Sequence, residues 1–248
     1  MDARTVAVVT GASRGLGKAL AEQLLGAGAR VITIARSHNP ALAEIAQRHG
    51  APLQQVLADL SQPESIETAA GMMSAAIPAD GTRYLLLNNA GTVDPVKRAD
   101  ELFDAEAVEK AFNLNVVAVM VLTAAFLRTT PAQADRRIVN VSSGAGRKPT
   151  RGWGVYCATK AALDHYTRVL ADEHPDLRVA ALAPGVIDTA MQQHIRGSDQ
   201  RQFPDLDRFI QLHEGGQLAS PESVARRILN HLVSDAFGNK LLDDIRNY

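Results

Sequence analysis

The sequence predicts a single doubly wound α/β domain, in which helices cover both faces of a parallel sheet. Short apolar runs such as TVAVVT (residues 5–10) and RVITIA (30–35) alternate with longer segments of helical periodicity. These runs are apolar at almost every position, which is typical of parallel strands buried on both faces. A glycine-rich turn follows the first run, as expected at the carboxyl edge of such a sheet.

The elements alternate along the whole chain of 248 residues, without a repeat or a linker, so one domain spanning 1–248 is expected. The expected strands are 5–10, 30–35, 52–60, 83–91, 136–143, 177–185 and a last short one within 239–244. The expected helices are 18–28, 39–50, 61–77, 104–127, 156–174 and 220–233.

Turn and capping residues support the helix boundaries. Pro40 lies near the start of the second helix and Gly50 lies just past its end. Ser61, with Glu64 three residues later, has the pattern of a capping box before the third helix. Ser220 is the expected start of the last helix.

Composition excludes several function classes. The net charge is −1 and no run of lysines and arginines occurs, which argues against nucleic acid or an anionic membrane as a partner. The most apolar run, 116–127, is too short to span a membrane and is expected to be a buried helix. One cysteine and no signal-peptide pattern fit a reducing cytoplasm. The seven histidines show no paired spacing, so no metal site is expected.

The turn VVTGASRGLG joins the first strand to the first helix and is a candidate dinucleotide site. Glycines at 11, 15 and 17 let phosphates approach the backbone, and the unpaired N–H groups of the helix attract an anion. The second strand ends in Ala35 and Arg36, where NAD-binding proteins usually carry an acid. Arg36 and Arg14 instead suit a 2′-phosphate, because guanidinium groups bind phosphate in a bidentate way. The sequence therefore predicts NADP(H) rather than NAD(H).

Several short motifs occur in a characteristic order along the chain. They are TGASRGLG (10–17), Asp59, NNAG (88–91), Asn115, Ser143, Tyr156 with Lys160, and PGVIDT (184–189). With this set the chain resembles the short-chain dehydrogenase/reductase family, whose members have a Rossmann fold, along nearly its whole length. The segments GWGVYCATKAAL (152–163) and APGVIDTAMQQHIR (183–196) are most similar to the sepiapterin reductase and benzil reductase group.

The resemblance implies a set of site residues. Asn115 would bend its helix and carry a water to Lys160, and Asp59 and Leu60 would contact the adenine. The full set implied for the cofactor is Gly11, Ser13, Arg14, Gly15, Leu16, Gly17, Arg36, Asp59, Leu60, Asn89, Ala90, Gly91, Tyr156, Lys160, Pro184, Gly185, Val186, Ile187 and Thr189.

Tyr156 and Lys160 are the centre of the expected chemistry. Reduction of a ketone leaves a negative oxygen that must be protonated, and a phenol with a pKa near 10 is a poor donor at neutral pH. Lys160, four residues on, shares a helix face with Tyr156 and is expected to lower its pKa. Ser143 and Ser142 both end a strand nearby and could bind the substrate oxygen; the family's spacing selects Ser143. The expected catalytic set is Asn115, Ser143, Tyr156 and Lys160.

Substrate-binding residues are harder to assign from sequence. Ser143 and Tyr156 are expected to contact the carbonyl group, and a polar segment at 189–219 is expected to cover the substrate. Trp153 is either a wall for an aromatic substrate or a packing residue. In sepiapterin reductases a C-terminal aspartate holds the pterin, and Asp243 or Asp244 is the candidate here, although two solvated acids would look the same.

The function expected is an NADPH-dependent carbonyl reductase acting on a ketone or diketone. One alternative is an NADP-dependent dehydrogenase that oxidises a secondary alcohol. Another is a non-catalytic NADP-binding redox sensor, although both Tyr156 and Lys160 are present. The resemblance also implies a homodimer or homotetramer, in which the apolar 115–127 segment and the helix carrying Tyr156 form the interface.

Overall fold

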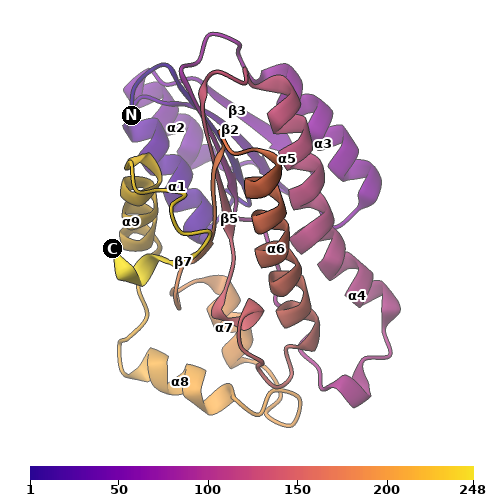
Figure 1. Cartoon of the computed structure of the whole chain (residues 1–248). Helices are drawn as coiled ribbons and strands as arrows, with labels where there is room; N and C mark the ends of the chain where they lie inside the picture. The colour runs from indigo at the N-terminus through magenta and orange to yellow at the C-terminus, as the bar shows by residue number, and fades with distance from the viewer.

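A computed structural model describes all 248 residues and contains one parallel seven-stranded sheet, with strands in the order β3-β2-β1-β4-β5-β6-β7 (Figure 1). The strands are β1 (Thr5–Thr10), β2 (Arg30–Ala35), β3 (Leu53–Leu57), β4 (Arg83–Asn88), β5 (Asp135–Val141), β6 (Arg178–Ala183) and β7 (Leu242–Asp244). The α-helices are α1 (Gly15–Gly26), α2 (Pro40–His49), α3 (Pro63–Ala76), α4 (Ala105–Phe112), α5 (Ala118–Thr129), α6 (Gly154–Glu173), α7 (Ala190–Arg196), α8 (Leu206–Glu214) and α9 (Pro221–Val233).

Helices cover both faces of the sheet, as the sequence predicts. Helices α1, α2 and α9 lie on one face, whereas α3, α5 and α6 lie on the other (Figure 1). Each face buries its own apolar cluster, one around Leu20 and Leu24 of α1 and one around Leu122 and Phe126 of α5. The strand order reverses between β1 and β4, so a ligand is expected where these two strands end.

The helix starts agree with the sequence at two places and differ at a third. The Asn39 side chain accepts a hydrogen bond from Ala41 N at 3.1 Å at the start of α2, and Ser220 Oγ accepts one from Ser223 N at 3.2 Å at the start of α9. Helix α3 follows Gln62 and has no side-chain cap. The predicted capping box is wrong because the Ser61 hydroxyl donates to Asp59 instead, at 2.8 Å.

Helices α4 and α5 join through a single π-helical turn, Asn113–Val117, into one continuous helix from Ala105 to Thr129. This helix has the length and hydropathy of a membrane span. The expectation that this segment is too short to span a membrane considered the apolar run 116–127 alone and is therefore wrong for the whole helix. In this fold half of its most apolar window is buried, and Leu122 and Phe126 pack in the core. It corresponds to the helix that the sequence predicts over 104–127.

The segment 189–219, called the covering segment below, carries the helices α7 and α8 at the carboxyl edge of the sheet (Figure 1). Its base is closed by two backbone hydrogen bonds, from Asp188 N to Ala219 O at 2.9 Å and from Ala219 N to Val186 O at 3.1 Å. Its middle approaches the loop before α6 so closely that a Cβ at Gly152 would lie 2.2 Å from Gln202 O. The covering segment is therefore packed against the edge of the sheet.

Candidate active site

The glycine-rich turn is held next to the end of β4 by Thr10, the last residue of β1. Thr10 Oγ1 accepts hydrogen bonds from the backbone N–H groups of Asn89 and Ala90, both at 2.9 Å. The Asn89 side chain in turn donates to Thr10 O at 2.9 Å. A Cβ at Gly11, which has a φ of 71°, would lie 3.0 Å from Ala90 Cα. The predicted NNAG and TGASRGLG motifs therefore lie side by side. The role of Thr10 could have been inferred from the sequence, because it is a polar residue at the end of an apolar strand.

The start of α1 fits the phosphates of a dinucleotide. Arg14 precedes this helix in an extended conformation and provides no side-chain cap, and no acidic residue lies in the first turn. The N–H groups of that turn carry partial positive charge and have no partner within the helix. Gly15 has a φ of 56°, and its Cβ would lie 3.3 Å from the methyl group of Thr189. These features form a cradle for an anion between α1 and the loop after β6.

The residues predicted for the rest of the cofactor surround this cradle along the sheet edge. Arg36 directly follows β2 and is exposed, and neither Arg36 nor Arg14 has an ion-pair partner. Leu60 is buried after β3, and Asp59 accepts hydrogen bonds from the N–H and hydroxyl of Ser61. The other predicted residues lie in the α1 turn or directly after β4 and β6: Ser13, Leu16, Gly17, Gly91, Pro184, Gly185, Val186 and Ile187. Contact of these residues with a cofactor stays a prediction.

Tyr156 and Lys160 lie one turn apart on α6 and face the same space. The Lys160 ammonium lies 5.6 Å from the centroid of the Tyr156 ring and donates a hydrogen bond to Val141 O at 2.7 Å. A Cβ at Gly91 would lie 3.7 Å from Lys160 Nζ and 3.2 Å from Asn115 Oδ1. The lack of a side chain at Gly91 therefore leaves room where these polar groups approach each other.

Asn115 lies in the π-helical turn between α4 and α5 and is 1% exposed. Its amide nitrogen donates to Thr92 O at 2.9 Å and to Thr159 Oγ1 at 3.0 Å, and its oxygen accepts from Thr92 N at 2.9 Å. Such turns commonly mark functional sites in helices. Asn115 thus connects the loop after β4 to α6 one residue before Lys160. A water between Asn115 and Lys160 stays a prediction.

The structure separates the two serines that end β5. Ser142 is buried and donates to Asp164 Oδ1 at 2.5 Å, away from the site, and Arg147 donates to the other oxygen of Asp164 at 2.9 Å. The Ser143 hydroxyl accepts from Ala145 N at 3.1 Å and also interacts with the Tyr156 phenol. Ser143 is therefore the serine positioned beside Tyr156. Asp164, four residues after Lys160, was not expected from the sequence.

Burial sets the ionisation of both central groups. It raises the pKa of Tyr156 to about 12, although a hydrogen bond from Ser143 opposes the rise. It lowers the pKa of Lys160 to about 8, against the opposing charge of Asp164. The sequence predicts a lowered pKa for Tyr156, which is wrong for the protein alone because loss of water around the phenolate outweighs its stabilisation by neighbouring groups. Tyr156 is accordingly a protonated phenol at neutral pH.

Trp153 packs under the covering segment. It is 6% exposed, it stacks on Phe203 with ring centroids 4.9 Å apart, and Phe209 lies 5.2 Å from it. Its other side meets the Tyr156 ring edge-on at 5.4 Å. The partly buried Cys157 packs against the same cluster, as expected for a space-filling residue. The two phenylalanines were not expected from sequence, since only tertiary packing brings residues fifty positions apart together.

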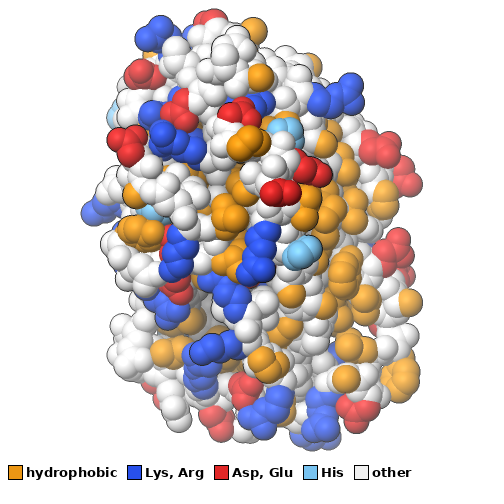
Figure 2. Space-filling model, viewed as in Figure 1, with side chains coloured by type: hydrophobic (Ala, Val, Ile, Leu, Met, Phe, Trp, Pro, Cys, Tyr) orange, Lys and Arg blue, Asp and Glu red, His pale blue; other side chains and the backbone are white.

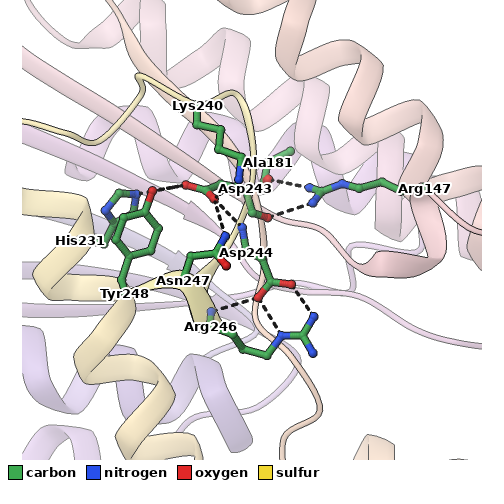
Figure 3. A network of polar contacts seen from close by, with 9 residues as sticks. All are labelled: Arg147, Ala181, His231, Lys240, Asp243, Asp244, Arg246, Asn247 and Tyr248. Carbon is green, nitrogen blue, oxygen red and sulfur yellow. Dashed lines mark hydrogen bonds and ion pairs between the residues drawn. The ribbon is translucent and has the colours of Figure 1, made fainter.

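Asp243 belongs to a buried network at the C-terminus (Figure 3). Its carboxylate is 1% exposed and accepts hydrogen bonds from Tyr248 at 2.5 Å and Lys240 at 3.1 Å, and His231 lies 3.7 Å away. Burial raises the pKa of Asp243, but these hydrogen bonds outweigh it and hold the value below the ordinary range. A substrate contact by Asp243 stays a prediction that would require this network to open. Asp244 pairs with Arg246 at 2.5 Å.

Comparison with known proteins agrees with this arrangement. The sequence profile of the short chain dehydrogenase family matches residues 5–200. A benzil reductase ((S)-benzoin forming) from Bacillus cereus is 39% identical over 236 residues, which cover 93% of this chain and 94% of that protein. A sepiapterin reductase from Bos taurus is 35% identical over 246 residues, which cover 94% of this chain and 91% of that protein.

Solved structures share the fold over nearly the full length. The crystal structure of the KRED1-Pglu enzyme is 34% identical, with a TM-score of 0.83 over 95% of this chain and 99% of that one. An alcohol dehydrogenase from the archaeon Thermococcus sibiricus, complexed with 5-hydroxy-NADP, is 26% identical, with a TM-score of 0.76 over 96% of this chain and 95% of that one. Together with the parallel sheet, the glycine turn and the Ser143, Tyr156 and Lys160 arrangement, these matches establish that the chain belongs to the short-chain dehydrogenase family of oxidoreductases.

Proposed function

We propose that this protein is an NADPH-dependent carbonyl reductase that acts on aromatic ketones or diketones. The observation that carries the proposal is the meeting of Ser143, Tyr156 and Lys160 at the sheet edge that also holds the uncapped start of α1. The likeness to benzil and sepiapterin reductases supports a carbonyl substrate.

The chain's own residues would bind the cofactor along the sheet edge. The first turn of α1 would receive the pyrophosphate, and Arg14 and Arg36 would bind a 2′-phosphate, since no acidic residue competes there. When bound, the reduced nicotinamide supplies the hydride that adds to the carbonyl carbon. The residues after β4 and β6 would hold the nicotinamide end, near Gly91 and Thr189.

Proton transfer would follow from the ionisation of Tyr156 and Lys160. The carbonyl oxygen would accept hydrogen bonds from Ser143 and from the Tyr156 phenol, which donates its proton as negative charge develops on that oxygen. The charged Lys160 would stabilise the resulting phenolate. Because the pKa of Tyr156 is raised to about 12, the phenol carries its proton throughout the neutral range. This is the protonation state from which the phenol can donate its proton to a reduced carbonyl.

The proposal is tested with purified enzyme, benzil and NADPH, by following absorbance of the reduced nicotinamide. Tyr156→Phe should bind NADPH with unchanged affinity and lose reduction by about a thousandfold or more. Cys157→Ser, a neighbouring change beside the same tyrosine, is the control and should retain activity. Normal turnover by Tyr156→Phe would reject the mechanism. Binding of NADPH with no reduction of any carbonyl by the unaltered protein would favour a redox sensor, and faster oxidation of benzoin would favour a dehydrogenase.

We further infer that a second copy of the chain covers the outer face of α5 and α6. Apolar side chains gather over these helices (Figure 2), and Val117, Met120 and Val169 are each more than one-third exposed. Family members are commonly oligomers, so a homodimer or homotetramer is proposed. A cytoplasmic location is proposed from the single free cysteine, Cys157. Light scattering of the protein and of Met120→Glu would test the oligomer, and a monomer before substitution would reject it.

A further inference from the structure

Two buried side chains beside the covering segment have hydrogen-bonding groups with no partner in the protein. Gln192 on α7 is 3% exposed, and neither its amide nitrogen nor its oxygen is hydrogen-bonded. Trp153 is 6% exposed, and its indole N–H also lacks an acceptor. Buried polar groups are nearly always paired, because desolvation without a partner is unfavourable. Asn88, Arg136, Arg178 and Arg196 each leave one buried atom unpaired as well, but in Gln192 both polar atoms of the side chain are unpaired.

Both residues belong to segments that pack near Tyr156. On α7, Gln192 lies three residues before Ile195, so the two side chains share a helix face. Ile195 packs in the same cluster as Trp153 and Phe203, and the Trp153 ring contacts the Tyr156 ring at 5.4 Å. The neighbours of Gln192 in sequence, Met191 and Gln193, are exposed instead. The buried face of α7 therefore faces the catalytic side of the covering segment.

A purely structural role does not account for Gln192. Buried amides elsewhere in this protein are bonded to the main chain or to other side chains: Asn115 makes three such hydrogen bonds and Asn39 caps α2. Gln192 makes none, so the amide does not stabilise the folded protein as those do. A leucine or methionine of similar volume would fill the same space without desolvating an amide.

We propose that Gln192 selects substrates that carry a second carbonyl group next to the reacting one. With the reacting carbonyl bound at Ser143 and Tyr156, the amide N–H of Gln192 and the indole N–H of Trp153 would donate to the adjacent carbonyl oxygen, whose two lone pairs accept two donors. The compound class is an aromatic 1,2-diketone. The inference deepens the proposed function and rests on it, since it requires that a carbonyl group is reduced beside Tyr156.

A matched pair of substrates and a matched pair of variants test this assignment. Benzil and deoxybenzoin have the same two rings and differ by one carbonyl group. Gln192→Met keeps the side-chain length and removes the amide, and Gln193→Met makes the same change at an exposed position one residue away. Steady-state kcat and KM with NADPH are measured for both ketones and all three proteins. Thermal unfolding of each variant is recorded as a check on folding.

Gln192→Met should lower kcat/KM for benzil about tenfold relative to kcat/KM for deoxybenzoin, the expected loss of one neutral hydrogen bond. Most of the change should fall on KM, because the second carbonyl does not react. The melting temperature should stay equal or rise, and Gln193→Met should leave the ratio unchanged. An equal effect on both ketones, no effect on either, or the same shift in ratio for Gln193→Met would each overturn the role of Gln192 while leaving carbonyl reduction intact. Failure of the unaltered enzyme to reduce either ketone would overturn the proposed function as well.

Discussion

The catalytic edge of the sheet and the compartment under the covering segment are built in different ways. At the edge, Asn115 and Thr10 are fully engaged in hydrogen bonds that fix the ends of β1 and β4 and the start of α6. Under the covering segment, Trp153 packs among aromatic and aliphatic side chains, and both Trp153 and Gln192 keep unpaired polar groups. The catalytic residues are thus positioned by hydrogen bonds between the ends of strands and helices. The proposed substrate selection depends instead on side chains that only tertiary packing brings together.

Removing Phe203 tests the compartment and should have the largest effect on stability. The ring is fully buried and stacks on Trp153, so Phe203→Ala should reduce the free energy of unfolding by about 3 kcal/mol and raise KM more than it lowers kcat. Urea unfolding followed by the emission of Trp153, the chain's one tryptophan, measures the loss of stability, since an exposed indole emits at longer wavelength. Steady-state kinetics with benzil measures KM and kcat. Phe103→Ala is the control, because that ring is 88% exposed. Equal losses for the two variants would mean that the compartment is not packed as described.

Reversing the charge of Arg36 tests the cofactor side of the edge. Arg36→Asp should weaken NADPH binding by about thirtyfold or more, the loss of charge-assisted hydrogen bonds to a phosphate, while NADH binds equally well or better. Dissociation constants for both nucleotides, measured by fluorescence, check the result. Arg226→Asp, an exposed arginine on α9, controls for net charge. A retained preference for NADPH would remove Arg36 from the cofactor site.

The pH dependence of reduction tests how the catalytic groups ionise. Lys160 has a pKa lowered to about 8, so it is charged below that value and neutral above it, whereas Tyr156 stays protonated up to about 12. The kcat/KM for benzil should therefore be level from about pH 6 to 7.5 and fall at higher pH by up to about tenfold per unit as Lys160 loses its charge. A rate that rises between pH 8 and 10 would contradict this assignment.

The smallest effect is expected from the C-terminal network. Tyr248→Phe keeps the ring that stacks on His231 at 3.8 Å but removes the hydrogen bond to Asp243. Because Tyr248 is half exposed, the free energy of unfolding should fall by only about 1 kcal/mol, and KM for benzil should not change. Chemical unfolding and steady-state kinetics check both. A change in KM without a change in stability would support a substrate contact by Asp243.

Much of the fold and of the catalytic edge is predictable from local sequence patterns. Apolar runs alternating with helical periodicity are sufficient for the parallel sheet, because each pattern depends on near neighbours in the chain. The four-residue spacing of Tyr156 and Lys160 places them on one face of any helix. The glycines at 11 and 15 require left-handed backbone, which the structure shows at both.

Other features could not be predicted, because they depend on which distant residues meet. The residues alone leave Ser142 and Ser143 as rivals, and only the family's spacing selects Ser143. In the structure Asp164 accepts a hydrogen bond from Ser142, and Ser143 lies beside Tyr156. The sign of the Tyr156 pKa shift depends on how much water the fold removes from the phenol. The capping box at Ser61 fails because Asp59 lies within reach of its hydroxyl.

The sequence by itself thus determined the sheet, the glycine turn and the Tyr156–Lys160 pair, since these follow from periodicity and from residues that are close in the chain. Only the tertiary structure decided that Trp153 stacks on Phe203, that Asp243 is enclosed by Tyr248 and Lys240, and that Gln192 lies buried without a partner. These properties arise from packing between segments that are remote in sequence, and no local pattern encodes how much surface such segments remove from water or which polar groups they leave unpaired.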